Sequence, residues 1–202
     1  METVASADLT CVLWVQEHLR AAWLNPVMVF VTNLNKSKWF WLAVACGYGV
    51  LVARAPREGR ARLVFLALLF AAMVGASDFA TSGIAKKLIH RRRPFLEHTE
   101  VHALVGAGPW SFPSGHATNA FACATFVTLA LRTWFAGAIA FTVALLAASS
   151  RLYLGVHYPT DLIAGAAVGS LFAAVFWRAR IFFESRYWQL APRATGAPSS
   201  DS

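Results

Sequence analysis

Long apolar segments constrain this chain more than any other feature of its sequence. Four of them carry no charged residue, and a fifth carries a single acid. A helix of about 20 apolar residues crosses a bilayer. Each of these segments is long enough to cross if the long side chains of flanking lysines and arginines reach outward to the membrane surface. The sequence therefore predicts an all-α, polytopic membrane helix bundle with five crossings: Trp39 to Ala53, Leu63 to Ile84, Ala117 to Leu131, Thr133 to Ser150 and Leu162 to Trp177.

The first 33 residues are less uniform. Asp8 to Arg20 mixes apolar residues with polar and charged ones, a pattern typical of a helix that lies in the membrane interface. Ala21 to Asn33 is apolar but short, and it adds a sixth crossing only if it spans. We expect one integral membrane domain over residues 1–185, which includes the N-terminal amphipathic helix, and a disordered polar tail over residues 186–202.

The chain is basic, with a formal net charge of +8, yet 57% of it is hydrophobic and only 14% is charged. A soluble nucleic-acid-binding protein would gather its basic residues on one polar surface. Here they form short clusters between apolar segments, which favours lipid phosphates and argues against nucleic acid. We expect the bilayer and a lipid phosphate or diphosphate as partners, and the sequence leaves the oligomeric state open.

Three polar clusters flank the apolar segments: Lys86 to Pro94, Trp110 to His116 and Ser150 to Asp161. No crossing separates the first cluster from the second. The segment that leaves the second cluster and the segment that enters the third are joined only by the short link at Arg132. Parity therefore predicts that all three clusters lie on one face of the membrane.

The opposite face carries the basic residues Arg54 to Arg62, Arg132 and Arg178 to Arg186. Because cytoplasmic loops are enriched in lysine and arginine, this face is the better cytoplasmic candidate. We expect the three polar clusters to face away from the cytoplasm. The basic residues of the Lys86 cluster then need a functional explanation.

The turn Pro113-Ser114-Gly115-His116 opens an apolar segment. Serine caps helices, and the free N–H groups of a helix start bind anions. A phosphate placed there would meet backbone donors and the Ser114 hydroxyl, and His116 could give a proton to a leaving oxygen. Read alone, the turn fits a capped helix start with an interfacial histidine equally well.

Lys86 and Arg93 lie seven residues apart, which approaches two helical turns. A lysine point charge and an arginine fork together suit a tetrahedral anion. We expect the neighbouring cations Lys87, Arg91 and Arg92 to be solvated or to contact acidic headgroups. Asp78 and Ser82 precede Lys86 at steps of four, so the acid either orients Lys86 or has a functional role of its own.

Arg151, His157 and Asp161 follow at the third cluster. Pro159 predicts a helix start, with His157 just outside it and Asp161 just within. A carboxylate that accepts from one imidazole nitrogen would leave the other free to attack phosphorus. The alternative is an exposed interfacial histidine near a helix cap.

Three further histidines, His90, His98 and His102, crowd the loop before Trp110, and the last two have a spacing compatible with metal ligands. No third ligand has a matching position, so we expect no metal site. The loop is more simply interpreted as a polar lid or a substrate-access segment.

Taken in order, Lys86-x6-Arg93-Pro94, Pro113-Ser114-Gly115-His116 and Ser150-Arg151-x5-His157-x3-Asp161 resemble the signature of the type-2 phosphatidic acid phosphatase superfamily. The resemblance implies that His157 is the nucleophile that forms a phosphohistidine, with Asp161 orienting it and His116 acting as general acid. It also implies an activity that needs no metal or other cofactor. The phosphate-binding residues that it implies are Lys86, Arg93, Ser114, Gly115 and Arg151.

The sequence thus predicts an integral membrane lipid phosphatase, with undecaprenyl diphosphate as the first substrate to test. Small bacterial members with this layout suggest three alternatives: phosphatidylglycerophosphate, phosphatidate and lipid A phosphates. A noncatalytic protein that binds or moves anionic lipids is the alternative from another class. It would show lipid binding without turnover.

Overall fold

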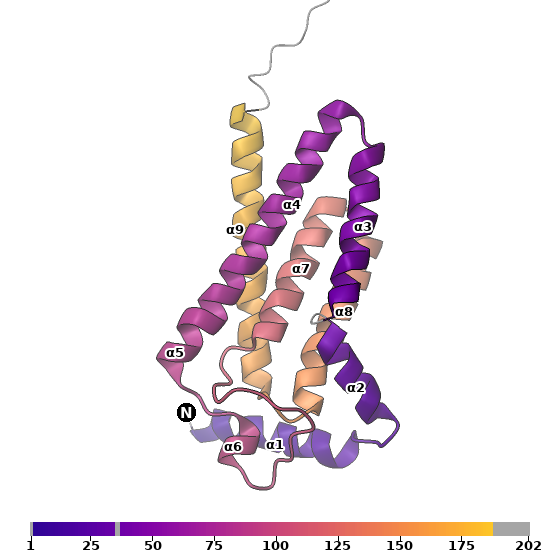
Figure 1. The fold of residues 1–202 in the computed structure, drawn as a ribbon. Helices are drawn as coiled ribbons and strands as arrows, with labels where there is room; N and C mark the ends of the chain where they lie inside the picture. The colour runs from indigo at the N-terminus through magenta and orange to yellow at the C-terminus, as the bar shows by residue number, and fades with distance from the viewer. Residues whose placement is uncertain (1, 35–36, 188–202) are drawn as a thin grey trace, which may run out of the picture.

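Long helices run side by side through the computed structural model, which describes residues 2–34 and 37–187 (Figure 1). They are α3 (Lys38–Arg54), α4 (Arg57–Asp78), α7 (Gly115–Leu131), α8 (Trp134–Tyr153) and α9 (Pro159–Tyr187). No β-strand occurs within the described ranges. The predicted all-α bundle is confirmed.

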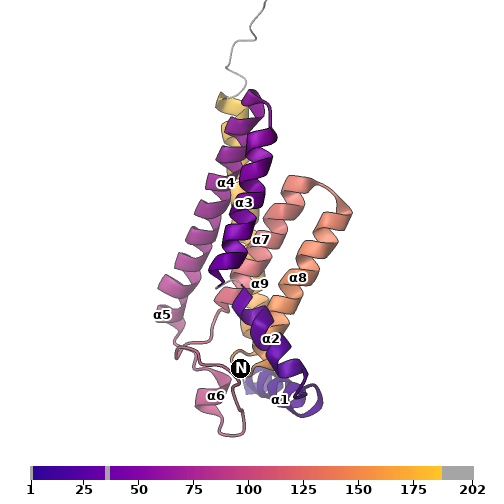
Figure 2. The same ribbon diagram turned by 45° about the vertical axis from the view of Figure 1, so that its right-hand side comes forward.

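The helix that begins as α4 continues past Asp78. It passes through a π-helical segment, η2 (Phe79–Ala85), into one last turn, α5 (Lys86–Ile89). His90 then adopts a left-handed conformation with φ 52° and ends the helix. A short helix, α6 (Pro94–Glu97), follows in the connection to α7. This connection lies at the same end of the bundle as the start of α9 (Figures 1 and 2).

The N-terminal helix α1 (Glu2–His18) lies across this end of the bundle (Figures 1 and 2). Its Val12 and Val15 side chains are buried, against Tyr158 and against Leu154 and Val156, respectively. The helix therefore begins before the predicted Asp8 and is fixed by protein contacts. Its placement in a membrane interface stays a prediction.

The next helix, α2 (Leu24–Asn33), has 10 residues and is about 15 Å long. A bilayer core is about 30 Å thick, so α2 alone is too short to cross it. It rises from α1 in the same direction as α3 (Figures 1 and 2). The sixth crossing considered for Ala21 to Asn33 would need neighbouring residues to complete it, and it stays a prediction.

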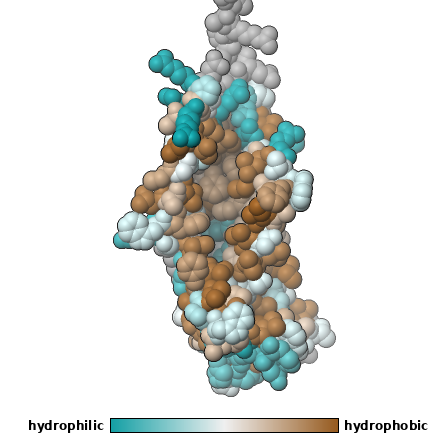
Figure 3. Space-filling view, turned by 90° about the vertical axis from the view of Figure 1, so that its right-hand side faces the viewer, coloured by the Kyte–Doolittle hydropathy of each residue, from teal (hydrophilic) through white to brown (hydrophobic). Residues whose placement is uncertain are grey.

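Among the described residues, three helices are both long and apolar enough to cross a membrane: Gly59–Ile89, Trp134–Tyr153 and Pro159–Arg186. The helices α3 and α7 each have 17 residues. On the face shown in Figure 3, apolar side chains cover much of the middle of the molecule, and hydrophilic residues gather toward both ends. The predicted boundary of the C-terminal tail lies inside α9, and residues 188–202 lie outside the described residues.

The closest packing in the bundle joins α7 to α9. Met73, Ala122, Phe126 and Ala173 form a buried core between these helices and α4. On α9, Gly169 approaches α7 so closely that an added Cβ would lie 2.0 Å from the carbonyl oxygen of Thr118. This contact brings the starts of the two helices together, and both helix starts carry predicted site residues.

Candidate active site

A polar cavity of about 280 Å³ opens between the helix ends on the α1 side of the bundle. Segments far apart in the sequence build its walls: the α4–α5 helix, the start of α7 and the link between α8 and α9. The cavity is lined by most of the predicted site residues: Lys86, Arg93, Gly115, His116, Arg151 and His157. Ser114 and Asp161 do not line it but are fully buried. All three clusters share one end of the bundle, as the parity argument requires, and their common membrane face stays a prediction.

His157 lies in the short link between α8 and α9. Gly155 turns this link with a φ of +73°, a conformation that side chains disfavour. Pro159 begins α9, as the sequence predicts. The histidine side chain is only 1% exposed, so the link presents it to the cavity and not to bulk solvent.

Two hydrogen bonds fix the tautomer of His157. Its Nε2 lies 2.9 Å from Nη1 of Arg93, and its Nδ1 lies 3.3 Å from Oδ2 of Asp161. Because a guanidinium is only a donor, Nε2 must accept and Nδ1 must carry the hydrogen. The Nε2 lone pair is therefore on the cavity side.

The surroundings of His157 favour its neutral form. Burial, followed by the positive charges of Arg93, Arg151 and Lys86, lowers the pKa of His157 well below its ordinary value. A neutral imidazole retains the lone pair that a nucleophile needs.

Asp161 stands in the first turn of α9 and is fully buried. Its Oδ2 also accepts from the backbone N–H of Tyr158 at 2.9 Å. A carboxylate at this position is stabilised by the helix dipole. The predicted pair of His157 outside the helix and Asp161 within it is confirmed in geometry.

Arg91 is bound inside the protein, so the interpretation of it as a solvated cation is wrong. Its Nη1 lies 2.9 Å from Oδ1 of Asp161, and its Nη2 lies 2.6 Å from Oδ2 of Asp8 on α1. Its guanidinium carbon lies 4.0 Å from the centre of the Tyr158 ring. Lys87 and Arg92 are exposed, as expected.

The sequence missed Asp8 and Arg91 because neither belongs to a spaced motif. One signal was available. Arg91 and Arg93 flank Arg92 in an extended segment, and alternate side chains of extended backbone point the same way. Ser111 supports this segment, since its N–H donates to the Arg91 carbonyl at 2.8 Å.

Arg93 reaches the cavity differently from the prediction. It lies beyond the left-handed turn at His90, so it does not share a helix with Lys86. Its Nη1 donates to the carbonyl of Val156 at 2.7 Å, and its Nε donates to the carbonyl of Gly108. These bonds hold the arginine against His157, while Lys86 enters the cavity from α5.

The turn before α7 is a capped helix start. Ser114 is the N-cap, and its Oγ accepts from the N–H of Ala117 at 3.5 Å. Its own N–H donates to the carbonyl of Asp161 at 3.0 Å and so ties α7 to α9. Because this hydroxyl caps the helix and is fully buried, Ser114 holds the turn instead of facing the cavity. Gly115 and His116 face the cavity.

Gly115 brings the α7 backbone close to the α4–α5 helix. A Cβ added there would lie 3.4 Å from Oγ of Ser82 and 3.9 Å from both Nζ of Lys86 and Oδ1 of Asp78. The turn and the lysine ammonium therefore border the same small space. Asp78 Oδ1 accepts from Ser82 and from Asn119, each at 3.4 Å.

Arg151 lies in the last turn of α8 and is 5% exposed. Its Nη1 donates to Oγ1 of Thr32 on α2 at 2.7 Å, and its buried Nε has no hydrogen-bond partner among the described residues. Helix α2 thus positions a cation of the site. This role of Thr32 had no counterpart in the sequence prediction.

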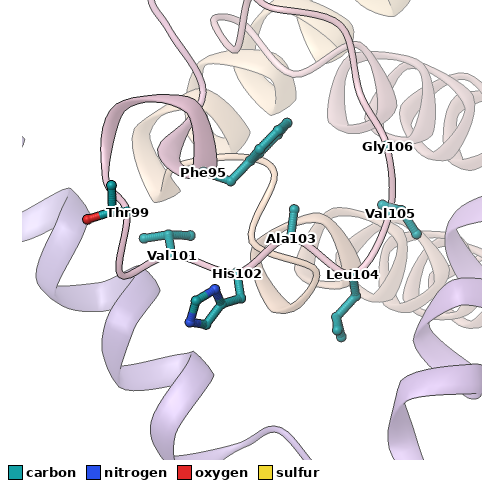
Figure 4. Close-up of a pocket in the computed structure, with 8 residues that line it drawn as sticks. All are labelled: Phe95, Thr99, Val101, His102, Ala103, Leu104, Val105 and Gly106. Carbon is teal, nitrogen blue, oxygen red and sulfur yellow. The ribbon is translucent and has the colours of Figure 1, made fainter.

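The loop between α6 and α7 borders a second, more open hollow of about 580 Å³ (Figure 4). The hollow is lined by Phe95, Thr99 and residues 101–106, and Gly106 also lines the first cavity. Gln16 of α1 fixes the loop through the carbonyl of Glu100 and the N–H of His102. Within the described ranges, no three His, Cys, Asp or Glu side chains gather as a metal site would require.

The chain matches the PAP2 superfamily over residues 64–184. It is 33% identical to phosphatidylglycerophosphatase B of Bacillus subtilis over 76% of this chain and 73% of that protein. It is 30% identical to the undecaprenyl-diphosphatase BcrC of the same organism over 55% of this chain and 56% of that protein.

A solved structure has the same arrangement of helices. The crystal structure of a transmembrane PAP2 type phosphatidylglycerolphosphate phosphatase from Bacillus subtilis superimposes with a TM-score of 0.68 at 28% identity. The likeness covers 90% of this chain and 88% of that one.

Proposed function

Because the chain belongs to the PAP2 superfamily, we propose that it is an integral membrane lipid phosphatase that works through a phosphohistidine on His157. The observation that carries this proposal is the pair of hydrogen bonds on His157. The Nε2 lone pair accepts from Arg93, and the hydrogen on Nδ1 is donated to Asp161. A buried neutral histidine oriented by a carboxylate is an activated nucleophile.

In the proposed first step the phosphate enters the 280 Å³ cavity. Lys86, Arg93 and Arg151 neutralise its oxygens, with the backbone N–H of Gly115 as a further donor. Arg93 now donates to Nε2, so it turns to a phosphate oxygen as the substrate binds. This releases the lone pair for attack on phosphorus.

The attack forms the Nε2–P bond and breaks the bond from phosphorus to the leaving oxygen. His116 gives its proton to that oxygen, and Asp161 stabilises the positive charge on the phosphorylated ring. Water then attacks the same phosphorus, with His116 taking its proton. Phosphate leaves, and His157 returns to its neutral form. The scheme uses protein cations in the place that a metal takes in other phosphatases.

Two lipids stand first as substrates. Undecaprenyl diphosphate suits a site with three cations, because a diphosphate brings more negative charge than a monoester. Phosphatidylglycerophosphate is favoured because phosphatidylglycerophosphatase B of Bacillus subtilis is similar over three quarters of this chain. Phosphatidate and lipid A phosphates are further members of the substrate panel.

We also propose that α3 and α7 cross the membrane, which makes five spans with the three longer helices. The apolar middle of the face shown in Figure 3 supports this topology. The end opposite the cavity carries many basic residues, which supports its placement in the cytoplasm. The cavity then opens to the periplasm of a bacterial inner membrane, and the lipid tail stays in the bilayer as its headgroup enters.

The proposal is tested by phosphate release from purified protein in dodecyl maltoside with excess EDTA. The four lipids are compared side by side, and His157→Ala and His116→Ala are measured with the wild type. We expect EDTA-resistant release that His157→Ala abolishes and His116→Ala slows strongly. Full activity in both variants would refute the mechanism. Lipid binding without turnover would favour the noncatalytic alternative.

A further inference from the structure

Asp8 belongs to the N-terminal helix, yet its carboxylate reaches the site and is only 3% exposed. Its Oδ2 accepts from Nη2 of Arg91 at 2.6 Å, and its Oδ1 accepts from the N–H of Thr160 at 3.1 Å. The Thr160 hydroxyl donates to it as well. Asp8 is thus bound to the first turn of α9, next to Asp161.

Arg91 connects the two carboxylates. Its Nη1 donates to Oδ1 of Asp161 at 2.9 Å, on the oxygen opposite the one that faces His157. The same nitrogen donates to the Thr160 hydroxyl at 2.6 Å. Its guanidinium also lies over the Tyr158 ring, an arrangement that restrains it further. A continuous chain of contacts therefore runs from Asp8 through Arg91 and Asp161 to His157.

We propose that Asp8 and Arg91 are positioning residues of the phosphoryl transfer, with Asp8 offsetting the charge of Arg91 so that Asp161 retains its own for His157. This inference rests on the proposed function. Neither residue touches the substrate. Both act through Asp161.

The charges explain why two carboxylates are needed. When Nε2 bonds to phosphorus, the ring keeps its Nδ1 hydrogen and becomes a cation, while the leaving oxygen takes the proton of His116. Arg91 and Asp161 alone would be neutral as a pair and would stabilise this cation poorly. With Asp8 the group carries a net charge of −1. Buried charges interact strongly because water does not screen them.

The fold gives α1 a role that composition alone does not suggest. Helix α1 supplies Asp8 to the chain of contacts that runs through Arg91 and Asp161 to His157, called the relay below. Gln16 on the same helix fixes the loop that borders the second hollow. Positioning through one intermediate residue is a common device in active sites, and its loss typically lowers activity by about 10- to 100-fold. The N-terminal helix is therefore part of the catalytic arrangement.

The test uses Asp8→Asn, Arg91→Gln and the double variant, with Glu17→Gln as control. Glu17 is an exposed acid of the same helix, so its variant removes an equal charge outside the relay. Phosphate release from undecaprenyl diphosphate and from phosphatidylglycerophosphate is measured in dodecyl maltoside. Thermal unfolding in the same detergent confirms that each variant is folded.

A second readout follows His157 itself through ¹⁵N-histidine NMR titration of the full chain. His157 faces Asp161 on α9, Arg93 from the connection before α6, Arg151 on α8 and Lys86 on α5. In Asp8→Asn, Arg91 and Asp161 remain as a neutral pair, so a positive charge on His157 is stabilised less. The titration midpoint of His157 therefore moves to lower pH. The double variant restores a net charge of −1 and returns the midpoint towards the wild-type value.

We expect Asp8→Asn to lower kcat by about 10-fold or more with little change in KM, because the affected charge develops during the reaction. Glu17→Gln leaves kcat and the midpoint unchanged. The inference is overturned if Asp8→Asn matches Glu17→Gln in both measurements, or if the double variant keeps the midpoint of Asp8→Asn. An inactive wild type would instead refute the proposed function, and the titration still decides the charge relay.

Discussion

Gly169→Ala tests whether close contact between α7 and α9 assembles the site. The added Cβ would lie 2.0 Å from the carbonyl oxygen of Thr118 and 2.9 Å from the N–H nitrogen of Ala122. Both contacts are with backbone, which cannot rotate away. The two helices must separate locally by about 1 Å or more to reach ordinary van der Waals distance.

The energetic effect has two opposing parts. Overpacking costs about 1–3 kcal/mol, and replacing glycine by alanine inside a helix returns about 1 kcal/mol. The net loss of stability is therefore small. The effect on catalysis is larger, because Ser114 on α7 and Asp161 on α9 are tied by a 3.0 Å hydrogen bond. A displacement of 1 Å can lower kcat by about 10²-fold.

The matched control is Gly75→Ala on α4, where an added Cβ meets nothing within 4 Å. Both variants are compared with the wild type by thermal unfolding and by phosphate release in dodecyl maltoside. We expect Gly75→Ala to keep full activity and Gly169→Ala to lose most of it while remaining folded. Equal activity in the two variants would show that close helix contact does not position the site.

Three further results are expected. Asp161→Asn lowers kcat by about 10⁴-fold, the loss seen when an asparagine replaces the acid that orients a catalytic histidine. If phosphate release fell by less than 10-fold, Asp161 would not be the group that orients His157. Burial and nearby cations lower the pKa of His157. Arg93→Gln removes one of these cations, so the pKa rises and the acid limb of the kcat/KM profile moves to higher pH than in the wild type. An unchanged acid limb would contradict the electrostatic account. Thr32→Val removes the hydroxyl that accepts from Arg151. We expect it to raise KM about 10-fold, since a hydrogen bond to a charged group contributes about 1.5 kcal/mol or more. An unchanged KM would show that this contact does not hold Arg151 in place.

The helices and their common face follow from the sequence because they depend on local patterns. Apolar segments of sufficient length predict crossings, and counting those crossings places the three polar clusters together. The N-cap at Ser114 and the helix start at Pro159 have local signals as well. The structure confirms the helices, the shared end of the three clusters, the cap at Ser114 and the helix start at Pro159. The crossings themselves stay a prediction.

The relay of Asp8 and Arg91 could not be predicted in this way. The two residues are 83 positions apart, and their pairing depends on how α1 folds back across the helix ends. Thr32 and Arg151 pair over 119 positions for the same reason. A single polar residue in an apolar helix has no spacing that reveals its partner.

The ends of the helices also limit prediction from sequence. The π-helical segment Phe79–Ala85 changes the angle at which later residues face the cavity, and the left-handed His90 ends the helix before Arg93. Even so, Lys86 and Arg93 both reach the cavity. Their approach from two separate elements was decided by tertiary packing.

The most direct test of the account is to trap the intermediate. Wild type, His116→Ala and His157→Ala are mixed with undecaprenyl diphosphate labelled in its terminal phosphate and quenched rapidly in alkaline detergent. The account predicts an acid-labile, alkali-stable phosphate on the peptide that contains His157, and none in His157→Ala. Phosphate release by the wild type without this adduct, or with the label on another residue, would contradict it.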